Sequence, residues 1–213
     1  VEQKRAWQGF TENIKHIRGD LYKRVLYQDA DETIKLSTTE LIKKDNTYQP
    51  HGQQITFCDD GKTIKSVQQF RYGFREGHCE NYFKGSKKIM CREQYTRGLP
   101  VGVWEYYNWD GDIVANEFYK NGKITKKITY KDGIETSESN WNALGNMHGK
   151  YRDSHNNGEL RARGNLKNGD MDGKWSFYYD NGNPNYNVVF KDGSPIHLEF
   201  FTIDGKLLWE KKL

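Results

Sequence analysis

The side chains near residue 150 come closest, in this sequence, to a set that could bind a metal ion or move a proton. His148, Asp153 and His155 lie within eight residues, and histidine with carboxylate is a common ligand and acid–base set. In an extended strand Asp153 and His155 would share one face, while His148 would lie on the other. Because a metal site needs three or four converging ligands, we expect ordinary strand and turn residues here and predict neither a metal site nor a cofactor.

A phosphate-binding loop is a second chemistry that the sequence suggests and then excludes. Gly61, Lys62 and Thr63 match the end of such a loop, but the motif also needs a glycine five residues before Gly61. That position is Thr56, and no G-x-S-x-G segment marks a serine nucleophile. We therefore predict no catalytic residue and expect that the chain is not an enzyme.

The cysteines offer redox chemistry, and two interpretations of them stay open. Cys79 and Cys91 lie at equal distances from Gly85, so a hairpin that turned at Gly85 would make them cross-strand partners. A disulfide would then fit a non-hydrogen-bonded pair. In a reducing compartment the same residues would be two small apolar side chains. Cys58 has no evident partner, and three cysteines are too few for a disulfide scaffold.

Repeats in the sequence indicate which elements carry these residues. Several segments run nine residues from one glycine to the next, and most are followed eleven residues later by a turn of the form aromatic-Lys-Asn/Asp-Gly. The clearest nine-residue segments are Gly102–Gly111, Gly149–Gly158 and Gly173–Gly182. The clearest turns are 119–122, 130–133, 166–169 and 190–193. Where the unit is regular it spans 24 or 25 residues, and the interval from Gly102 to Gly149 is about two units long.

This pattern predicts an all-β fold of tandem β-hairpin repeats that form an extended, twisted antiparallel meander sheet. Asn-Gly and Asp-Gly supply the positive φ angles of tight hairpin turns, and a single hairpin needs neighbours for stability. We assign residues 52–213 to the hairpin array and residues 1–51 to a degenerate N-terminal repeat or cap. Leu198 to Trp209, around Asp204-Gly205, is expected to be a closing hairpin.

Aromatic residues at two fixed positions of the repeat should face opposite sides of the sheet. Trp104, Tyr151 and Trp175, two residues after the leading glycine, are the predicted core. The residues five after the glycine are either structural or an aromatic surface that binds a partner. This second set, which we call the offset-five residues, comprises Phe57, Tyr82, Tyr107 and Tyr178.

Trp109 and a run of lysines complete the predicted partner-binding residues. Trp109 lies beside a predicted turn, where a tryptophan would be an exposed anchor. Lys123, Lys126 and Lys127 belong to the densest basic run of the chain. The run is interpreted either as a solvated strand edge protected against pairing or as a docking patch for an acidic partner.

The recurring G-x-W-x-[YF]-Y-x-x-[DN]-G followed by [YF]-K-[DN]-G resembles the bacterial variant of the MORN repeat, which is typical of YwqK-type antitoxin-like proteins. The resemblance covers roughly residues 52–209. It implies a single-layered array of hairpins, a role in binding another protein such as a toxin or an assembly subunit, and no catalytic residue. The sequence departs from the pattern at Cys79, which replaces the tryptophan, and at Ser154, which interrupts the offset-five aromatics.

Two other functions remain as alternatives. The Trp/Tyr/Gly pattern is also similar to choline-binding cell-wall repeats, which implies a glycan or cell-envelope ligand, although those units are nearer 20 residues long. The array could instead be a structural scaffold component of a larger assembly.

Composition and charge argue against two further classes of protein, those that bind nucleic acid and those that span a membrane. The net charge of +4 is too mild to predict nucleic-acid binding. The mean hydropathy is −0.99, and no apolar run approaches the ~18 residues of a membrane span. The compartment is open between the cytoplasm and export after removal of an N-terminal signal.

Overall fold

The described residues form strands and turns, and every strand is antiparallel to its neighbours. The computed structural model describes residues 3–7 and 9–213, and it contains no helix among them. The chain divides into two units, Val1–Gly111 and Asp112–Leu213.

The strands of the first unit are β1 (Gln3–Trp7), β2 (Phe10–Arg18), β3 (Leu21–Tyr27), β4 (Lys35–Lys44), β5 (Thr47–Phe57), β6 (Ile64–Arg71), β7 (Phe74–Arg75), β8 (Gly77–Tyr82), β9 (Ile89–Thr96), β10 (Leu99–Pro100) and β11 (Gly102–Tyr107). Those of the second unit are β12 (Ile113–Lys120), β13 (Lys123–Lys131), β14 (Ile134–Asn140), β15 (Gly149–Ser154), β16 (Leu160–Lys167), β17 (Asp170–Tyr178), β18 (Pro184–Lys191), β19 (Ser194–Phe201) and β20 (Leu207–Lys212).

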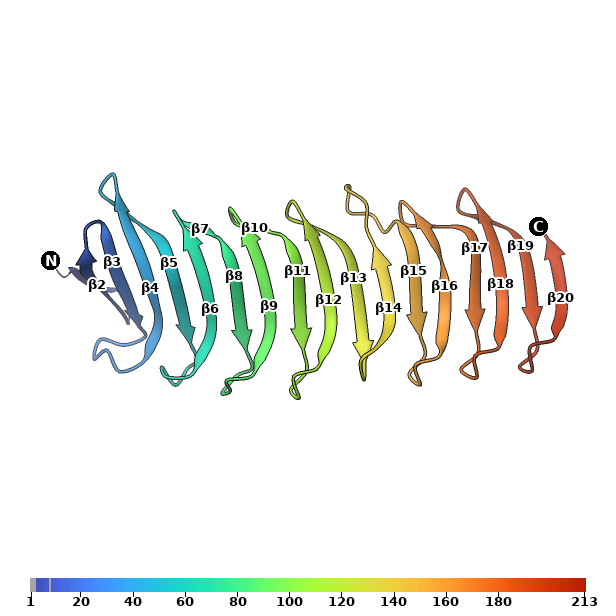
Figure 1. Ribbon diagram of the computed structural model, residues 1–213, viewed down its shortest axis with the longest axis horizontal. Coiled ribbons are helices and arrows are strands. Elements are labelled where there is room, and N and C mark those ends of the chain that lie inside the picture. The colour runs from blue at the N-terminus through green and yellow to red at the C-terminus, as the bar shows by residue number, and fades with distance from the viewer. Residues whose placement is uncertain (1–2, 8) are drawn as a thin grey trace. The chain divides into compact units, whose positions relative to one another are not determined.

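Strand pairing follows chain order within each unit (Figure 1). In the first unit β1 to β6 pair in sequence, β8 pairs with β6, and β9 lies between β8 and β11. The two-residue strands β7 and β10 pair with β6 and β9. In the second unit each strand from β12 to β20 pairs with the next. The predicted all-β meander of antiparallel hairpins is therefore confirmed.

Tight turns form where the sequence predicts them. At Asn121-Gly122 the φ angles are 50° and 80°, and at Asp192-Gly193 they are 51° and 76°. Two consecutive positive φ angles define the type I′ turn, whose twist matches that of the flanking strands. Asparagine and aspartate tolerate this region better than most residues, which explains why the repeat keeps Asn or Asp before its glycine.

Each unit is a single layer of strands. The strands contact their neighbours in the sheet, and no second sheet or helix covers either face in the described ranges. Burial therefore depends on side chains of adjacent strands, and it is deepest at isolated points such as Leu41 (1% exposed), Cys79 (2%) and Trp175 (2%). Many large side chains are only half-buried as a result.

The repeat units correspond to hairpins. The double-length interval from Gly102 to Gly149 contains the four strands β11 to β14, as many as two hairpins need. The predicted closing hairpin is formed by β19 and β20. The domain boundary predicted at residues 51 and 52 lies within β5, whereas the two compact units meet at residues 111 and 112.

Candidate functional site

Two of the offset-five residues, Tyr82 and Tyr107, belong to a ladder of polar side chains on one sheet face. Strand register places Arg92 opposite both Glu80 and Glu105. The hydroxyl of Tyr82 donates to Glu80 at 2.7 Å, and Arg92 donates to the hydroxyl of Tyr107 at 3.2 Å. Burial and the bond to Glu80 raise the pKa of Tyr82 to about 12, and burial also raises the pKa of Tyr107. Both phenols are therefore neutral and fixed in position by charged neighbours.

Cations cover the rings of three offset-five residues. The guanidinium of Arg92 lies 5.6 Å from the ring centre of Tyr107, and that of Arg163 lies 5.6 Å from the ring centre of Tyr178. The ammonium of Lys35 lies 5.4 Å from the ring centre of Phe57. These distances fit cation–π contacts. In each unit, taken by itself, these rings lie on a polar face where cations shield them, and the role of that face in partner binding stays a prediction.

Trp109 is exposed, as its place beside a turn predicts. Its exposed fraction is 52%. Its ring packs against Phe83 with 5.2 Å between ring centres, and the ammonium of Lys88 lies 5.2 Å above it. Lys88 also donates to the carbonyl oxygen of Trp109 at 2.8 Å. These contacts hold the indole at the surface in one orientation.

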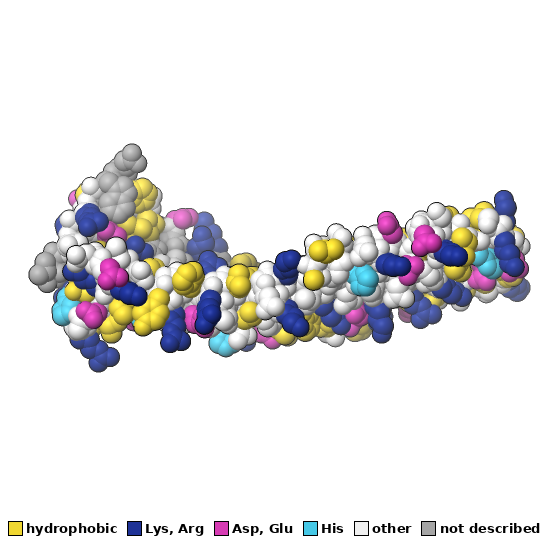
Figure 2. Space-filling view, turned by 90° about the horizontal axis from the view of Figure 1, so that it is seen from above, with side chains coloured by type: hydrophobic (Ala, Val, Ile, Leu, Met, Phe, Trp, Pro, Cys, Tyr) yellow, Lys and Arg dark blue, Asp and Glu magenta, His cyan; other side chains and the backbone are white. Residues whose placement is uncertain are grey.

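The predicted lysine patch does not gather on one face. Lys126 and Lys127 are adjacent in β13 and so lie on opposite sides of the sheet, while Lys123 donates to the carbonyl oxygen of Ala143. The two ion pairs are Lys126–Glu138 at 3.1 Å and Lys127–Glu117 at 2.9 Å. In the view from above in Figure 2, toward the ends of the strands, basic and acidic side chains are interspersed.

The cross-strand pairing expected for Cys79 and Cys91 is wrong. A bulge between Asn81 and Tyr82 shifts the register, so that Cys79 lies opposite Glu93 and Cys91 lies opposite Asn81. Both thiols are free and buried. Burial raises the pKa of Cys79 to about 12 and that of Cys91 to about 11. They are therefore two small, unreactive core residues, and Cys58 is likewise free and buried.

A run of aromatic rings lies on the other face of the second unit, and the sequence predicted only two of its members, Tyr151 and Trp175, as core residues. Strand register places Phe177, Tyr186, Phe200 and Trp209 directly opposite one another across β17 to β20. Successive ring centres lie 4.3, 5.4 and 4.7 Å apart, with interplanar angles of 15–24°. Trp175 and Tyr151 continue the run at 6.0 and 5.4 Å. We call these six residues the aromatic row: Tyr151, Trp175, Phe177, Tyr186, Phe200 and Trp209.

The aromatic row packs on the backbone of the sheet at Trp175 and is exposed to solvent at Trp209. Trp175 lies flat on Gly164, and its indole nitrogen donates to the carbonyl oxygen of Asn165 at 2.9 Å. Exposure rises from 2% at Trp175 to 43% at Trp209. The sequence contained part of the signal for the row, because Trp175 and Phe177 lie on one face of their strand. To predict the remaining rings, one would also need the register of β18, β19 and β20.

An open groove of about 500 Å³ lies along the first half of the aromatic row. Tyr151, Trp175, Phe177 and Tyr186 form much of its apolar lining, together with Met147 and Met171. Asp153 and Arg161, which form an ion pair, supply polar groups at the same groove. Apolar walls with a few polar groups are typical of ligand-binding concavities.

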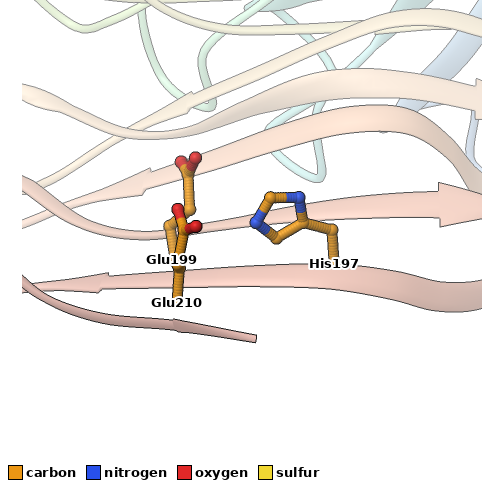
Figure 3. Close-up of side chains that lie close together, drawn as sticks. All are labelled: His197, Glu199 and Glu210. Carbon is orange, nitrogen blue, oxygen red and sulfur yellow. The ribbon is translucent and has the colours of Figure 1, made fainter. Parts of the chain in front are cut away.

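The histidines near residue 150 do not converge. The Nε2 atom of His155 lies 2.9 Å from the carbonyl oxygen of Tyr178, whereas His148 is exposed. A different set does converge, since ligand atoms of His197, Glu199 and Glu210 lie within 4.8 Å of one another (Figure 3). The register of the closing hairpin, centred on Asp204-Gly205, would have been needed to find it in the sequence.

Comparison with known proteins identifies the repeat type. Residues 112–132 and 171–192 match the sequence model of the MORN repeat variant family. The first match covers β12 and β13 with the turn between them, and the second covers most of β17 and all of β18. MORN repeats are generally non-enzymatic modules that bind proteins or membranes. No curated protein sequence matches the chain at a significant level.

A search for membrane-spanning helices gives a negative result. Among residues 3–7 and 9–213, none belongs to a helix with the length and hydropathy needed to cross a bilayer.

Proposed function

We propose that this chain, in which MORN-type repeats recur, is a non-enzymatic module that binds another protein through its aromatic row. The observation that carries the proposal is the stacking of rings from Phe177 to Trp209 on a face that no second layer covers in the described part of the second unit. Rings held by their neighbours lose little conformational entropy on binding, and tyrosine and tryptophan are enriched among residues that dominate interface energies.

The finer form of the proposal is an antitoxin-like role, in which the sheet covers a working surface of its partner. The repeat type supports this role, and so does the continuity of the row, whose rings from Phe177 to Trp209 stack across four strands and suit contact with an extended surface. A scaffold subunit in a larger assembly would use the same row to hold a neighbouring subunit.

The polar face carries a second candidate surface. In the first unit Tyr82 donates to Glu80 and Tyr107 lies against Arg92, and Trp109 is exposed in that unit. In the second unit, taken by itself, Tyr178 lies against Arg163. A partner that carries acidic groups could compete for Arg92 and Arg163. This surface follows the residues predicted from the sequence and provides a direct comparison with the aromatic row.

A glycan is the second candidate ligand, and the groove along the row favours it. The half-buried rings of Tyr151 and Tyr186 would stack on sugar rings, while Asp153 would accept and Arg161 would donate hydrogen bonds. This alternative predicts retention of the chain on polysaccharide supports in the absence of any protein partner.

The experiment is affinity capture from extracts of the source cells, with the wild type beside three variants. Trp209→Ala removes the most exposed ring of the row, and Leu208→Ala is its matched control, because Leu208 is adjacent and 65% exposed but has no aromatic ring. Tyr107→Ala/Tyr178→Ala tests the polar face. We expect a partner that is retained by Leu208→Ala and by the double variant but lost by Trp209→Ala.

Two other outcomes would contradict the assignment. If only Tyr107→Ala/Tyr178→Ala lost the partner, the binding site would lie on the polar face. Absence of any protein from wild-type captures, together with retention on glycans, would replace protein binding by carbohydrate binding.

A further inference from the structure

Three metal-ligating side chains meet on the polar face of the closing hairpin. His197 and Glu199 are two residues apart in β19 and share a face, and Glu210 in β20 lies directly opposite Glu199. One ligand atom from each lies within 4.8 Å of the other two. Figure 3 shows the imidazole directed toward the two carboxylates.

The imidazole nitrogen at the centre of this group has no partner. The Nε2 atom of His197 is buried from solvent, and it makes no hydrogen bond with any described residue. A buried polar atom without a partner costs free energy. A lone pair on Nε2 that points toward carboxylates is, however, the arrangement that a metal ion would satisfy.

Repulsion between the two carboxylates also costs free energy, and a bound metal ion would remove this cost as well. Like charges directly opposite each other on neighbouring strands are destabilising, and within the described ranges neither Glu199 nor Glu210 forms an ion pair. Lys212, opposite His197 in the register, is exposed and forms no ion pair there either. A cation between the carboxylates would turn repulsion into attraction.

A supporting hydrogen bond already orients one of the carboxylates. The side-chain amide of Asn187 in β18 donates to Oε2 of Glu199 at 2.7 Å. Outer-shell partners of this kind fix the direction of metal ligands in known sites. This hydrogen bond engages only one of the two carboxylate oxygens of Glu199.

We propose that His197, Glu199 and Glu210 bind one divalent transition-metal ion. Imidazole nitrogen combined with carboxylate oxygen suits Zn²⁺ and its first-row neighbours rather than Ca²⁺ or Mg²⁺, which prefer ligand sets of oxygen alone. Three protein ligands leave a further coordination position for water. The ion would fasten β20 to β19 at the end of the aromatic row, although its ligands lie on the opposite face from Phe200 and Trp209.

Calorimetric titration of Zn²⁺ into the full chain, with Mg²⁺ as a comparator, tests this site. We expect one Zn²⁺ per chain for the wild type and for the control His148→Ala, whose imidazole is exposed and far along the sequence. His197→Ala and Glu210→Gln should abolish saturable binding. Asn187→Ala should weaken it by roughly 10- to 100-fold, as loss of an outer-shell partner does.

Thermal unfolding with and without Zn²⁺ separates a lost ligand from a misfolded variant. In the presence of a chelator Glu210→Gln should unfold at the same temperature as the wild type or higher, because it removes a like-charge pair. Zn²⁺ should then raise the unfolding temperature of the wild type and of His148→Ala but not that of Glu210→Gln. Failure of the wild type to bind Zn²⁺, or undiminished binding by both His197→Ala and Glu210→Gln, would overturn the site.

Discussion

The contact between Gly164 and Trp175 limits which residue β16 can carry at that position. A Cβ atom at residue 164 would lie 2.2–2.6 Å from three atoms of the indole, far inside van der Waals contact. The indole is itself anchored by its hydrogen bond to Asn165, so it cannot move aside cheaply. Glycine is therefore required at this point for a packing reason, since its backbone does not adopt a positive φ.

Gly164→Ala should destabilise the fold by about 1–3 kcal/mol, which is the usual cost of overpacking. Urea unfolding followed by tryptophan fluorescence measures it. In a Trp175→Val background the same change should cost much less, because the clash is gone. An equal cost in both backgrounds would show that the contact with Trp175 is not the cause.

The buried thiols lead to a prediction about reactivity and pH. Because burial raises the pKa of Cys79 and Cys91 above the ordinary value of 9.0, little thiolate exists in the folded chain at mildly alkaline pH. Alkylating reagents should modify neither residue until the chain is unfolded in urea, as mass spectrometry of the two peptides would show. Rapid modification of native Cys79 or Cys91 would contradict this account of their burial.

The same shifts give a stability that depends on pH. A thiol whose pKa is higher in the folded state holds its proton more tightly there, so its contribution is complete below about pH 9. That contribution should fall as the pH rises toward the folded values of about 11 and 12. Unfolding midpoints in urea should therefore decrease over this alkaline range, and by less in Cys79→Ala/Cys91→Ala.

At the scale of the element, the aromatic row connects β17 to β20 through ring stacking as well as through backbone hydrogen bonds. Tyr186 is stacked on both sides, against Phe177 at 4.3 Å and Phe200 at 5.4 Å. Each such pair contributes about 0.5–1.5 kcal/mol beyond the burial of area. Removal of this one ring interrupts the row in its middle.

Tyr186→Ala should therefore lower stability by about 1–3 kcal/mol. Hydrogen exchange should accelerate in β17, β18 and β19, which flank the missing ring. Tyr179→Phe, which removes only a hydroxyl that donates to the carbonyl oxygen of Phe201, is a milder control on the neighbouring loop. Unchanged exchange in β19 after Tyr186→Ala would show that stacking does not couple these strands.

The hairpins themselves could be predicted because their turns are encoded locally. Asn121-Gly122 and Asp192-Gly193 identify tight turns with no knowledge of the rest of the chain. The register between strands could not be predicted in the same way. The pairing of Tyr82 with Ile89 is already one residue away from symmetry about Gly85, and the bulge between Asn81 and Tyr82 adds one more, so that Cys79 pairs with Glu93 and Cys91 with Asn81.

The candidate site was less accessible to prediction than the hairpins, for the same reason. Phe177, Tyr186, Phe200 and Trp209 come from four strands, and their alignment depends on a bulge in each of three successive pairings. In the lysine run, closeness in sequence does not correspond to closeness on the surface. Residues adjacent in sequence, such as Lys126 and Lys127, look like one patch but lie on opposite faces with separate acidic partners.

At the scale of the whole molecule, strands that contact only their neighbours make stability a local property. A defect in one hairpin should spread to the adjacent hairpins and then fade. Hydrogen exchange in β3 to β5 of the first unit should therefore be unaffected by Tyr186→Ala in the second. Acceleration throughout the chain would instead indicate one cooperative folding unit.

Side-chain footprinting of the captured complex tests whether the aromatic row is the surface that binds a partner protein. Hydroxyl radicals modify exposed aromatic side chains, so Phe200 and Trp209 should react in the free chain. Our account predicts that the partner protects both residues while Trp109 and Leu208 stay as reactive as before. Unchanged reactivity of Phe200 and Trp209, with protection of Trp109 or Tyr107 instead, would contradict it.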